Sequence, residues 1–276
     1  MSQKEICDAI ILGIKDYFEK NNFKKAVIGL SGGIDSSVAL TLAAKSIGSK
    51  NVTAVLMPDL GTSSKESIGD SLLLAKKLKV PHKLIEINDF LKNFEKINSK
   101  LKLKKNVFSV ANAKARTRMS ILYYLANMQN ALVIGTSDKS EIALGYTTKY
   151  GDNASDILVI ADLWKTEVIE IGKFLGVPKN ILSKKPSAEL ILGQDAEKEL
   201  GAPYDVLDKI LKMYIEQNIP AKEIIGKGFD EKIVKSAIKR VRINEHKRRN
   251  APIIRLSEKS FHSLEWRMPI TNGFDG

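Results

Sequence analysis

The feature that most constrains the fold is an alternation of short apolar segments with segments of helical periodicity. The apolar segments, which are rich in β-branched residues, are 25–30, 51–57, 82–87 and 131–135. The segments with apolar residues at helical spacing are 36–47, 64–78 and 111–130. Short buried strands that alternate with helices favour a parallel sheet covered by helices on both faces. The sequence therefore predicts an α/β fold whose ligands bind beyond the carboxyl ends of the strands.

The remaining segments are assigned from the same periodicities. Further helices are predicted at the N-terminus, where Ile6, Ile10, Ile14 and Phe18 share one face, and at 163–175, 203–218 and 230–249. A short strand is predicted at 252–256, and irregular loops at 138–162 and 179–194. No linker rich in Gly, Ser or Pro interrupts the pattern, so residues 1–276 are expected to form a single domain with C-terminal helices.

Charge and cysteine content narrow the class of protein. Lysine and arginine number 44 against 32 acidic residues, and the net charge of +12 favours anionic partners. A single cysteine, Cys7, excludes an internal disulfide and a Cys-rich zinc site. No apolar run approaches the roughly 20 residues that span a bilayer, and the N-terminus has no signal-peptide pattern. These features favour a cytoplasmic protein that handles anions.

A glycine-rich loop between the first strand and the next helix is the main candidate site. Its residues are Gly29, Leu30, Ser31, Gly32, Gly33, Ile34, Asp35 and Ser36. Glycines allow close backbone approach, and the N–H groups of a helix start favour an anion. Asp35 would repel phosphate, so it is expected to hold a Mg²⁺ ion that bridges to phosphates. The alternative is a plain glycine turn with a capped helix.

The loop differs from the Walker A and GxGxxG patterns. The sequence SGGIDSS instead resembles the pyrophosphatase loop of the N-type ATP pyrophosphatases, which have a Rossmann-like, adenine nucleotide alpha hydrolase-like fold. Residues 134–167, with a TKYGD segment and a Lys-Thr-Glu segment, are similar to the NAD synthetase pattern within that group. Shorter matches occur at 112–116, 185–190 and 246–248, so the resemblance covers most of the chain. Asn153-Ala154 departs from the Gly-Gly of many relatives.

The resemblance implies roles for individual residues. The glycine loop, Thr136, Lys165 and Ser187 match positions that hold ATP, and Asp35 and Glu141 match positions that hold Mg²⁺. Catalysis is thereby assigned to Asp35, Glu141 and Lys165. The positions that match contacts to deamido-NAD, at a homodimer interface in the family, are Arg116, Lys149, Asp156, His246 and Lys247.

The implied reaction is ATP- and Mg²⁺-dependent amidation of deamido-NAD to NAD with ammonia. The nicotinate carboxylate attacks the α-phosphorus of ATP, pyrophosphate leaves, and ammonia displaces AMP from the acyl adenylate. No general base emerges from the sequence. Cys7 adjoins Asp8, which disfavours a thiolate, and the matched blocks begin at Gly29, so free ammonia is expected instead of a built-in glutaminase.

Two alternatives remain open at this point. A related ATP pyrophosphatase that modifies tRNA would account for the +12 charge, although the paired cysteines of thiolating enzymes are absent. A nucleotide-binding sensor would keep the fold without turnover, but it would have no need for both acids and Lys165. The sequence therefore favours an enzyme with small-molecule substrates, and neither nucleic acid nor membrane as partner.

Overall fold

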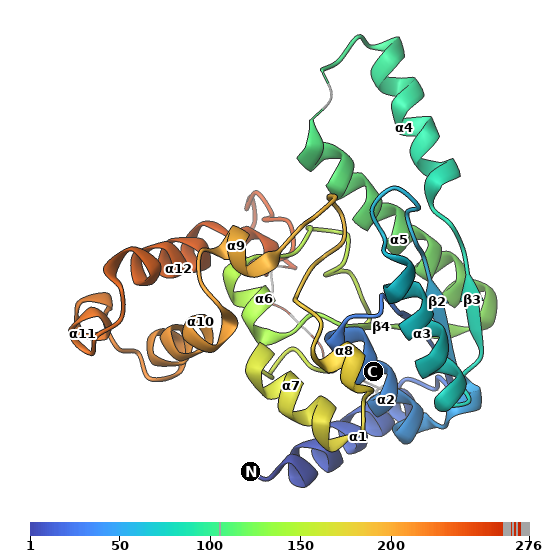
Figure 1. The fold of residues 1–276 in the computed structure, drawn as a ribbon, viewed down its shortest axis with the longest axis horizontal. Coiled ribbons are helices and arrows are strands. Elements are labelled where there is room, and N and C mark those ends of the chain that lie inside the picture. Colours follow the sequence, from blue (N-terminus) through green and yellow to red (C-terminus); the bar gives the residue numbers. More distant parts are fainter. Residues whose placement is uncertain (105, 262–265, 267, 269, 272–276) are drawn as a thin grey trace.

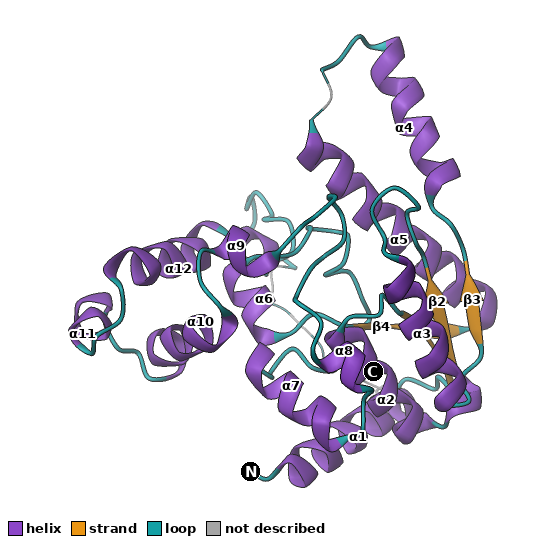
Figure 2. Ribbon diagram, in the orientation of Figure 1, coloured by secondary structure: helices purple, strands orange, loops and turns teal. Residues whose placement is uncertain are grey.

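The computed structural model describes residues 1–104, 106–261, 266, 268, 270 and 271. In this part of the chain, five parallel strands form a sheet in the order β3-β2-β1-β4-β5 (Figures 1 and 2). The strands are β1 (Lys25–Gly29), β2 (Val52–Leu56), β3 (His82–Leu84), β4 (Ala131–Gly135) and β5 (Ile157–Leu158). The parallel α/β fold predicted from the sequence is confirmed.

Helices connect the strands and cover both faces of the sheet (Figure 2). The helices up to the middle of the chain are α1 (Gln3–Lys20), α2 (Ile34–Ile47), α3 (Lys65–Lys77), α4 (Asn88–Lys100) and α5 (Val107–Gln129). The later helices near the sheet are α6 (Lys139–Leu144), α7 (Lys165–Phe174) and α8 (Lys179–Leu182). No helix of the described residues is long and apolar enough to cross a membrane.

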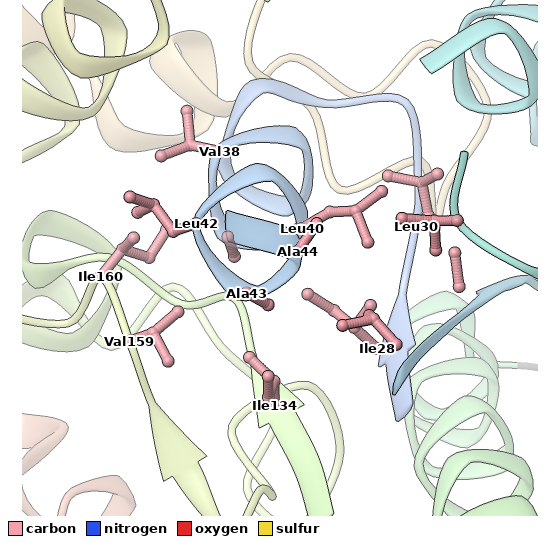
Figure 3. Close-up of a cluster of buried hydrophobic side chains, with 14 of the residues drawn as sticks. Ile28, Leu30, Val38, Leu40, Leu42, Ala43, Ala44, Ile134, Val159 and Ile160 are labelled. Atoms are coloured by element: carbon pink, nitrogen blue, oxygen red, sulfur yellow. The ribbon is translucent and has the colours of Figure 1, made fainter. Parts of the chain in front are cut away.

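The alternation of side chains along β1 divides the core between two faces. Ala26 and Ile28 pack in a cluster with α1, α2 and α7, whereas Val27 belongs to a cluster with α5 on the opposite face. Figure 3 shows α2 lying over Ile28 and Ile134, with Leu42 pointing toward Ile160. Both faces of β1 and β4 are therefore buried, which explains why these strands read as continuous apolar runs.

A separate apolar cluster lies in the C-terminal helices. These helices are α9 (Ala196–Leu200), α10 (Tyr204–Leu211), α11 (Ala221–Gly226) and α12 (Glu231–Ile243). Leu207, Ile210 and Val234 are fully buried there, and Leu144 of α6 joins the same cluster. This packing fixes α6, and with it the segment after β4, to the C-terminal helices.

Several sequence predictions of local structure were wrong. Residues 252–256 form no strand, because no neighbouring segment pairs with them. The predicted loop at 138–162 contains α6 and β5, both short enough to lack a clear periodicity. The predicted helix at 203–218 continues beyond α10 only as a π-helical turn at Lys212–Glu216. The helix predicted at 230–249 ends at Ile243, before a 3-10 turn.

Candidate active site

The site lies where the strand order changes direction. The connections after β1 and β4 leave the sheet in opposite directions, so their first residues meet at the carboxyl ends of these two strands. The glycine loop follows β1, and residues 136–138 follow β4. The two segments predicted to carry chemistry are therefore adjacent, although about a hundred residues separate them in the sequence.

Gly32 gives the glycine loop its shape. Its φ is +83°, a conformation that favours glycine, and a Cβ atom there would lie 2.3 Å from the backbone oxygen of Ser67. Ser36 closes the turn, since its hydroxyl donates to the Gly33 carbonyl oxygen (3.2 Å) and accepts from the Ser31 N–H (3.2 Å). The loop is thus a fixed turn at the start of α2, pressed against α3.

Three carboxylates converge on one ammonium group in front of this loop. Lys165 Nζ lies 2.7 Å from Asp35 Oδ2, 2.7 Å from Asp138 Oδ2 and 2.9 Å from Glu141 Oε1. One ligand oxygen of each acid lies within 4.8 Å of the others. We call these four residues the inner site. It joins the start of α2, the start of α6 and the start of α7.

The electrostatics of the inner site follow from burial and mutual pairing. Burial raises the pKa of Asp138 to about 7, although Lys165 opposes the shift. Burial also raises the pKa of Glu141 well above its usual range, again against Lys165. Burial alone would lower the pKa of Lys165, but its carboxylate neighbours outweigh this and hold that pKa well above its usual range. Lys165 is therefore a charged ammonium in an acidic environment.

Neighbouring residues fix the backbone around Lys165. Its N–H donates to Ser140 Oγ (2.9 Å), and that hydroxyl donates to Asp208 of α10 (2.5 Å). The preceding residue, Trp164, is buried, and its indole N–H donates to Glu216 (2.9 Å). Trp164 is thus a packing residue that ties the start of α7 to the C-terminal helices.

The inner site opens into a cavity of about 740 Å³. The predicted ATP residues that line it are Gly29, Leu30, Ser31, Gly33, Ile34, Asp35, Ser36, Thr136, Lys165 and Ser187. Glu141 and Lys247 also line it. Gly32 does not line the cavity, and it packs against the Ser67 backbone instead. The structure therefore brings the predicted nucleotide residues together around one hollow.

Residues 184–194, which we call the strap, run between α8 and α9 (Figure 1). The strap forms one wall of the cavity. Lys184 Nζ donates to Gly32 O (3.2 Å) and pairs with Asp70 (2.7 Å). Glu189 accepts a hydrogen bond from Ser67 Oγ (2.6 Å). At the far end of the strap, the buried Lys114 donates to Leu190 O (2.8 Å). The strap is therefore held to α3, α5 and the glycine loop at several points.

The residues predicted to bind the dinucleotide do not all lie at the cavity. Arg116, Lys149 and His246, which we call the outer group, lie beside one another: Arg116 Nε donates to Lys149 O (3.3 Å) and Lys149 Nζ donates to His246 O (2.7 Å). The outer group does not line the cavity. Lys247 does, but its Nζ donates to Gly145 O (2.6 Å) and Thr147 O (2.8 Å).

Asp156 lies apart from the cavity and the outer group. Its carboxylate accepts hydrogen bonds from the Val133 N–H (2.7 Å) and the Tyr123 hydroxyl (3.2 Å), so it anchors the chain beside β4. Nearby, Asn153 accepts from the Tyr150 N–H (2.9 Å) and donates to Lys247 O (3.1 Å). The Asn-Ala departure from the family pattern thus has a structural use in this chain.

The sequence interpretation missed Asp138. This fully buried residue caps α6, since its side chain accepts from the Glu141 N–H (2.8 Å), and it also contacts Lys165. The signal was available, because an aspartate three residues before a glutamate is typical of a helix start. Lys184, Tyr146 and Gln194 also line the cavity without having been singled out.

The acids of the inner site fit a hard divalent cation. Carboxylate oxygens are the ligands that Mg²⁺ prefers, and here three carboxylates come within 4.8 Å of one another. Asp35 Oδ1 is buried and lacks a hydrogen-bond partner among the described residues. An oxygen atom in that state has coordination capacity that the protein itself does not use.

Comparison with known proteins places these features in a family context. The sequence model of the NAD synthase family matches residues 6–251. A glutamine-dependent NAD(+) synthetase of Thermotoga maritima is 42% identical over 281 residues, covering 99% of this chain but 48% of its own length. The chain thus spans about half the length of that relative. An NH(3)-dependent NAD(+) synthetase of Staphylothermus marinus is 44% identical, and the match covers 88% of each chain.

Solved structures agree with the sequence comparison. The NMN synthetase of Francisella tularensis superposes with a TM-score of 0.82 at 34% identity, covering 93% of this chain and all of that one. The two proteins therefore share a fold over nearly their whole length.

Proposed function

Because the chain belongs to the NAD synthase family, we propose that it amidates deamido-NAD to NAD with ATP and ammonia. The observation that carries the proposal is the convergence of Asp35, Glu141 and Lys165 beside a glycine loop in one cavity. Such an arrangement provides acids for a metal ion, a cation and N–H donors for phosphates, and space for a second substrate. The outer group and Lys247 are assigned to the dinucleotide.

The chemistry requires an activated carboxylate, since oxide is too poor a leaving group for direct attack by ammonia. Adenylation by ATP provides that activation, and charge develops on the phosphate oxygens. The glycine loop would position the phosphates, and the Lys165 ammonium would stabilise the pyrophosphate that leaves. Asp35 and Glu141 would hold Mg²⁺, which supplies charge neutralisation at the phosphates when bound.

Ammonia itself is the proposed nitrogen donor. Cys7 is buried, and burial raises the pKa of its thiol, so it is a poor nucleophile. The match to the NH(3)-dependent relative covers 88% of that protein. The test compares the rate of NAD formation with ammonium and with glutamine as the nitrogen source. NAD formed only with ammonium supports the proposal, and an equal rate with glutamine contradicts it.

A homodimer is proposed on the basis of an exposed apolar face on α4. Phe90, Phe94 and Ile97, spaced at helical intervals, are 47%, 45% and 51% exposed, and α4 projects from the body of the molecule (Figure 1). Exposed apolar surface of this kind marks an interface. Sedimentation velocity should show a dimer that Phe94→Asp dissociates, and a wild-type monomer at micromolar concentration would contradict the proposal. We also propose that residues 1–276 form one domain and that the enzyme is cytoplasmic.

The deciding assay combines deamido-NAD, ATP, Mg²⁺ and ammonium, and measures NAD, AMP and pyrophosphate. Equal amounts of the three products support the proposal. The same assay is run with nicotinate mononucleotide, because the chain shares its fold with an NMN synthetase. It tests whether this smaller acid is the preferred substrate. Absence of NAD, together with ATP cleavage stimulated by tRNA, would favour the nucleic-acid-modifying alternative.

A further inference from the structure

The Lys165 ammonium occupies the centre of the acid cluster in this structure. It contacts all three carboxylates at 2.7 to 2.9 Å, and its side chain is only 2% exposed. A divalent cation held by the same three acids would need the same central position, because their ligand oxygens lie within 4.8 Å of one another. Lysine and metal therefore cannot share these oxygen atoms in their present arrangement.

The cluster is built for more positive charge than one lysine provides. Asp138 is fully buried, and its Oδ2 shares the Lys165 ammonium, at 2.7 Å, with Asp35 and Glu141. The buried Asp35 Oδ1 has no hydrogen-bond partner among the described residues. Three carboxylates around one ammonium, with one oxygen left over, suit a cation of higher charge that has more coordination positions.

The Lys165 side chain has space to move into when it leaves the acid cluster. Its backbone stays fixed at the start of α7 through the hydrogen bond to Ser140 Oγ. Its side chain lines the 740 Å³ cavity together with the glycine loop. Rotation about its side-chain bonds would move the ammonium from the acids toward the place assigned to the phosphates.

We propose that Lys165 is the resident cation of the inner site, that it competes with a divalent metal ion for Asp35, Asp138 and Glu141, and that Asp138 is a third carboxylate of that metal site. Lys165 thus holds the acids together while no metal is bound and is released toward the phosphates when the acids turn to the metal. The release of Lys165 toward the phosphates rests on the proposed function, whereas its competition with the metal ion does not.

The competition is tested with Mn²⁺ alone, without nucleotide, by electron paramagnetic resonance of free Mn²⁺. Lys165→Met removes the ammonium and keeps the length of the side chain, so Mn²⁺ should bind at least about tenfold more tightly than to the wild type. Lys139→Met is the matched control, because Lys139 adjoins Asp138 but pairs with Asp162 and Glu216 instead. It should bind Mn²⁺ as the wild type does.

Asp138 is tested in the Lys165→Met background. Asn retains the oxygen that caps α6 but lacks the charge, so adding Asp138→Asn should reverse most of the gain in Mn²⁺ affinity. If Lys165→Met folds poorly, Lys165→Gln replaces it, and the rise in Tm caused by Mn²⁺ is compared with that of the wild type.

Unchanged or weaker Mn²⁺ binding in both Lys165 variants would overturn the proposal. Unchanged binding after Asp138→Asn would remove Asp138 from the metal site. Neither measurement involves ATP or deamido-NAD, so failure of the amidation assay would leave this result intact, and the reverse also holds.

Discussion

The inner site and the outer group contrast in how their charged groups are satisfied. In the inner site, charged side chains pair with one another in a buried cluster, and their positions are set by the starts of three helices. In the outer group, the exposed Arg116 and the half-buried Lys149 donate to backbone carbonyl oxygens instead. All the charged groups of the inner site therefore come from one chain, whereas the outer group has charges left for a ligand or a second chain.

This contrast predicts that changes in the inner site affect turnover and that changes farther out affect substrate affinity. Lys247, which lines the cavity yet donates to the 145–147 turn, lies between these two cases. Four substitutions test the gradient.

The largest effect is expected for Asp35→Asn. The substitution removes a charge that faces both Lys165 and the proposed metal, so kcat should fall roughly 100- to 1000-fold. Steady-state rates of NAD formation at saturating ATP and deamido-NAD provide the measurement. A kcat close to that of the wild type would show that the inner site is not catalytic.

Gly32→Ala should have the next largest effect. The added Cβ would meet the Ser67 backbone, so the loop must move, and kcat/KM for ATP should fall roughly 100-fold. Gly176→Ala is the matched control, because Gly176 has φ +72° but open space around its Cβ position. The control should lose about 1 kcal/mol of stability, measured by urea unfolding, with normal activity. Similar activity losses in both variants would attribute the effect to backbone strain.

A smaller and more selective effect is expected for Lys247→Met. Loss of a partly buried, hydrogen-bonded charge should raise KM for deamido-NAD about tenfold, with KM for ATP changed less than about threefold. Initial rates with each substrate varied in turn separate the two constants. Equal increases would place Lys247 in the support of the whole cavity and not in dinucleotide binding.

The smallest effect is expected for Lys149→Met. The Lys149 ammonium is accessible to solvent, where its contact with a charged ligand contributes little to binding. KM for deamido-NAD should therefore rise only about twofold to fivefold at unchanged kcat. Isothermal titration with deamido-NAD gives an independent affinity. A kcat loss comparable to that of Asp35→Asn would break the contrast between the inner site and the outer group.

The sequence predicted the fold and the glycine loop because both depend on local patterns. Apolar runs identified four of the five strands, and the SGGIDSS segment carries its own turn and helix start. β5 has two residues, too few for a pattern to emerge. α4 was overlooked although Phe90, Phe94 and Ile97 have helical spacing, because they stand in a segment rich in charged and polar side chains.

The candidate site was only partly predictable, since contacts between distant segments leave no local trace. Asp138 could have been recognised as a helix cap, but its contact with Lys165 depends on how α6 and α7 pack. Similarly, Lys184 reaches the glycine loop only because α8 lies beside α3. The anchoring of Asp156 to Val133 depends on the pairing of β4 with the residues next to β5.

The burial of Trp164 gives the protein a built-in optical reporter. The chain has two tryptophans, and the other, Trp266, is 51% exposed. A water-soluble quencher such as iodide would suppress emission from Trp266 and leave that of the buried indole. Since the indole of Trp164 donates to Glu216 and packs among the C-terminal helices, the emission that survives quenching reports on how the start of α7 is held against them, without any attached dye.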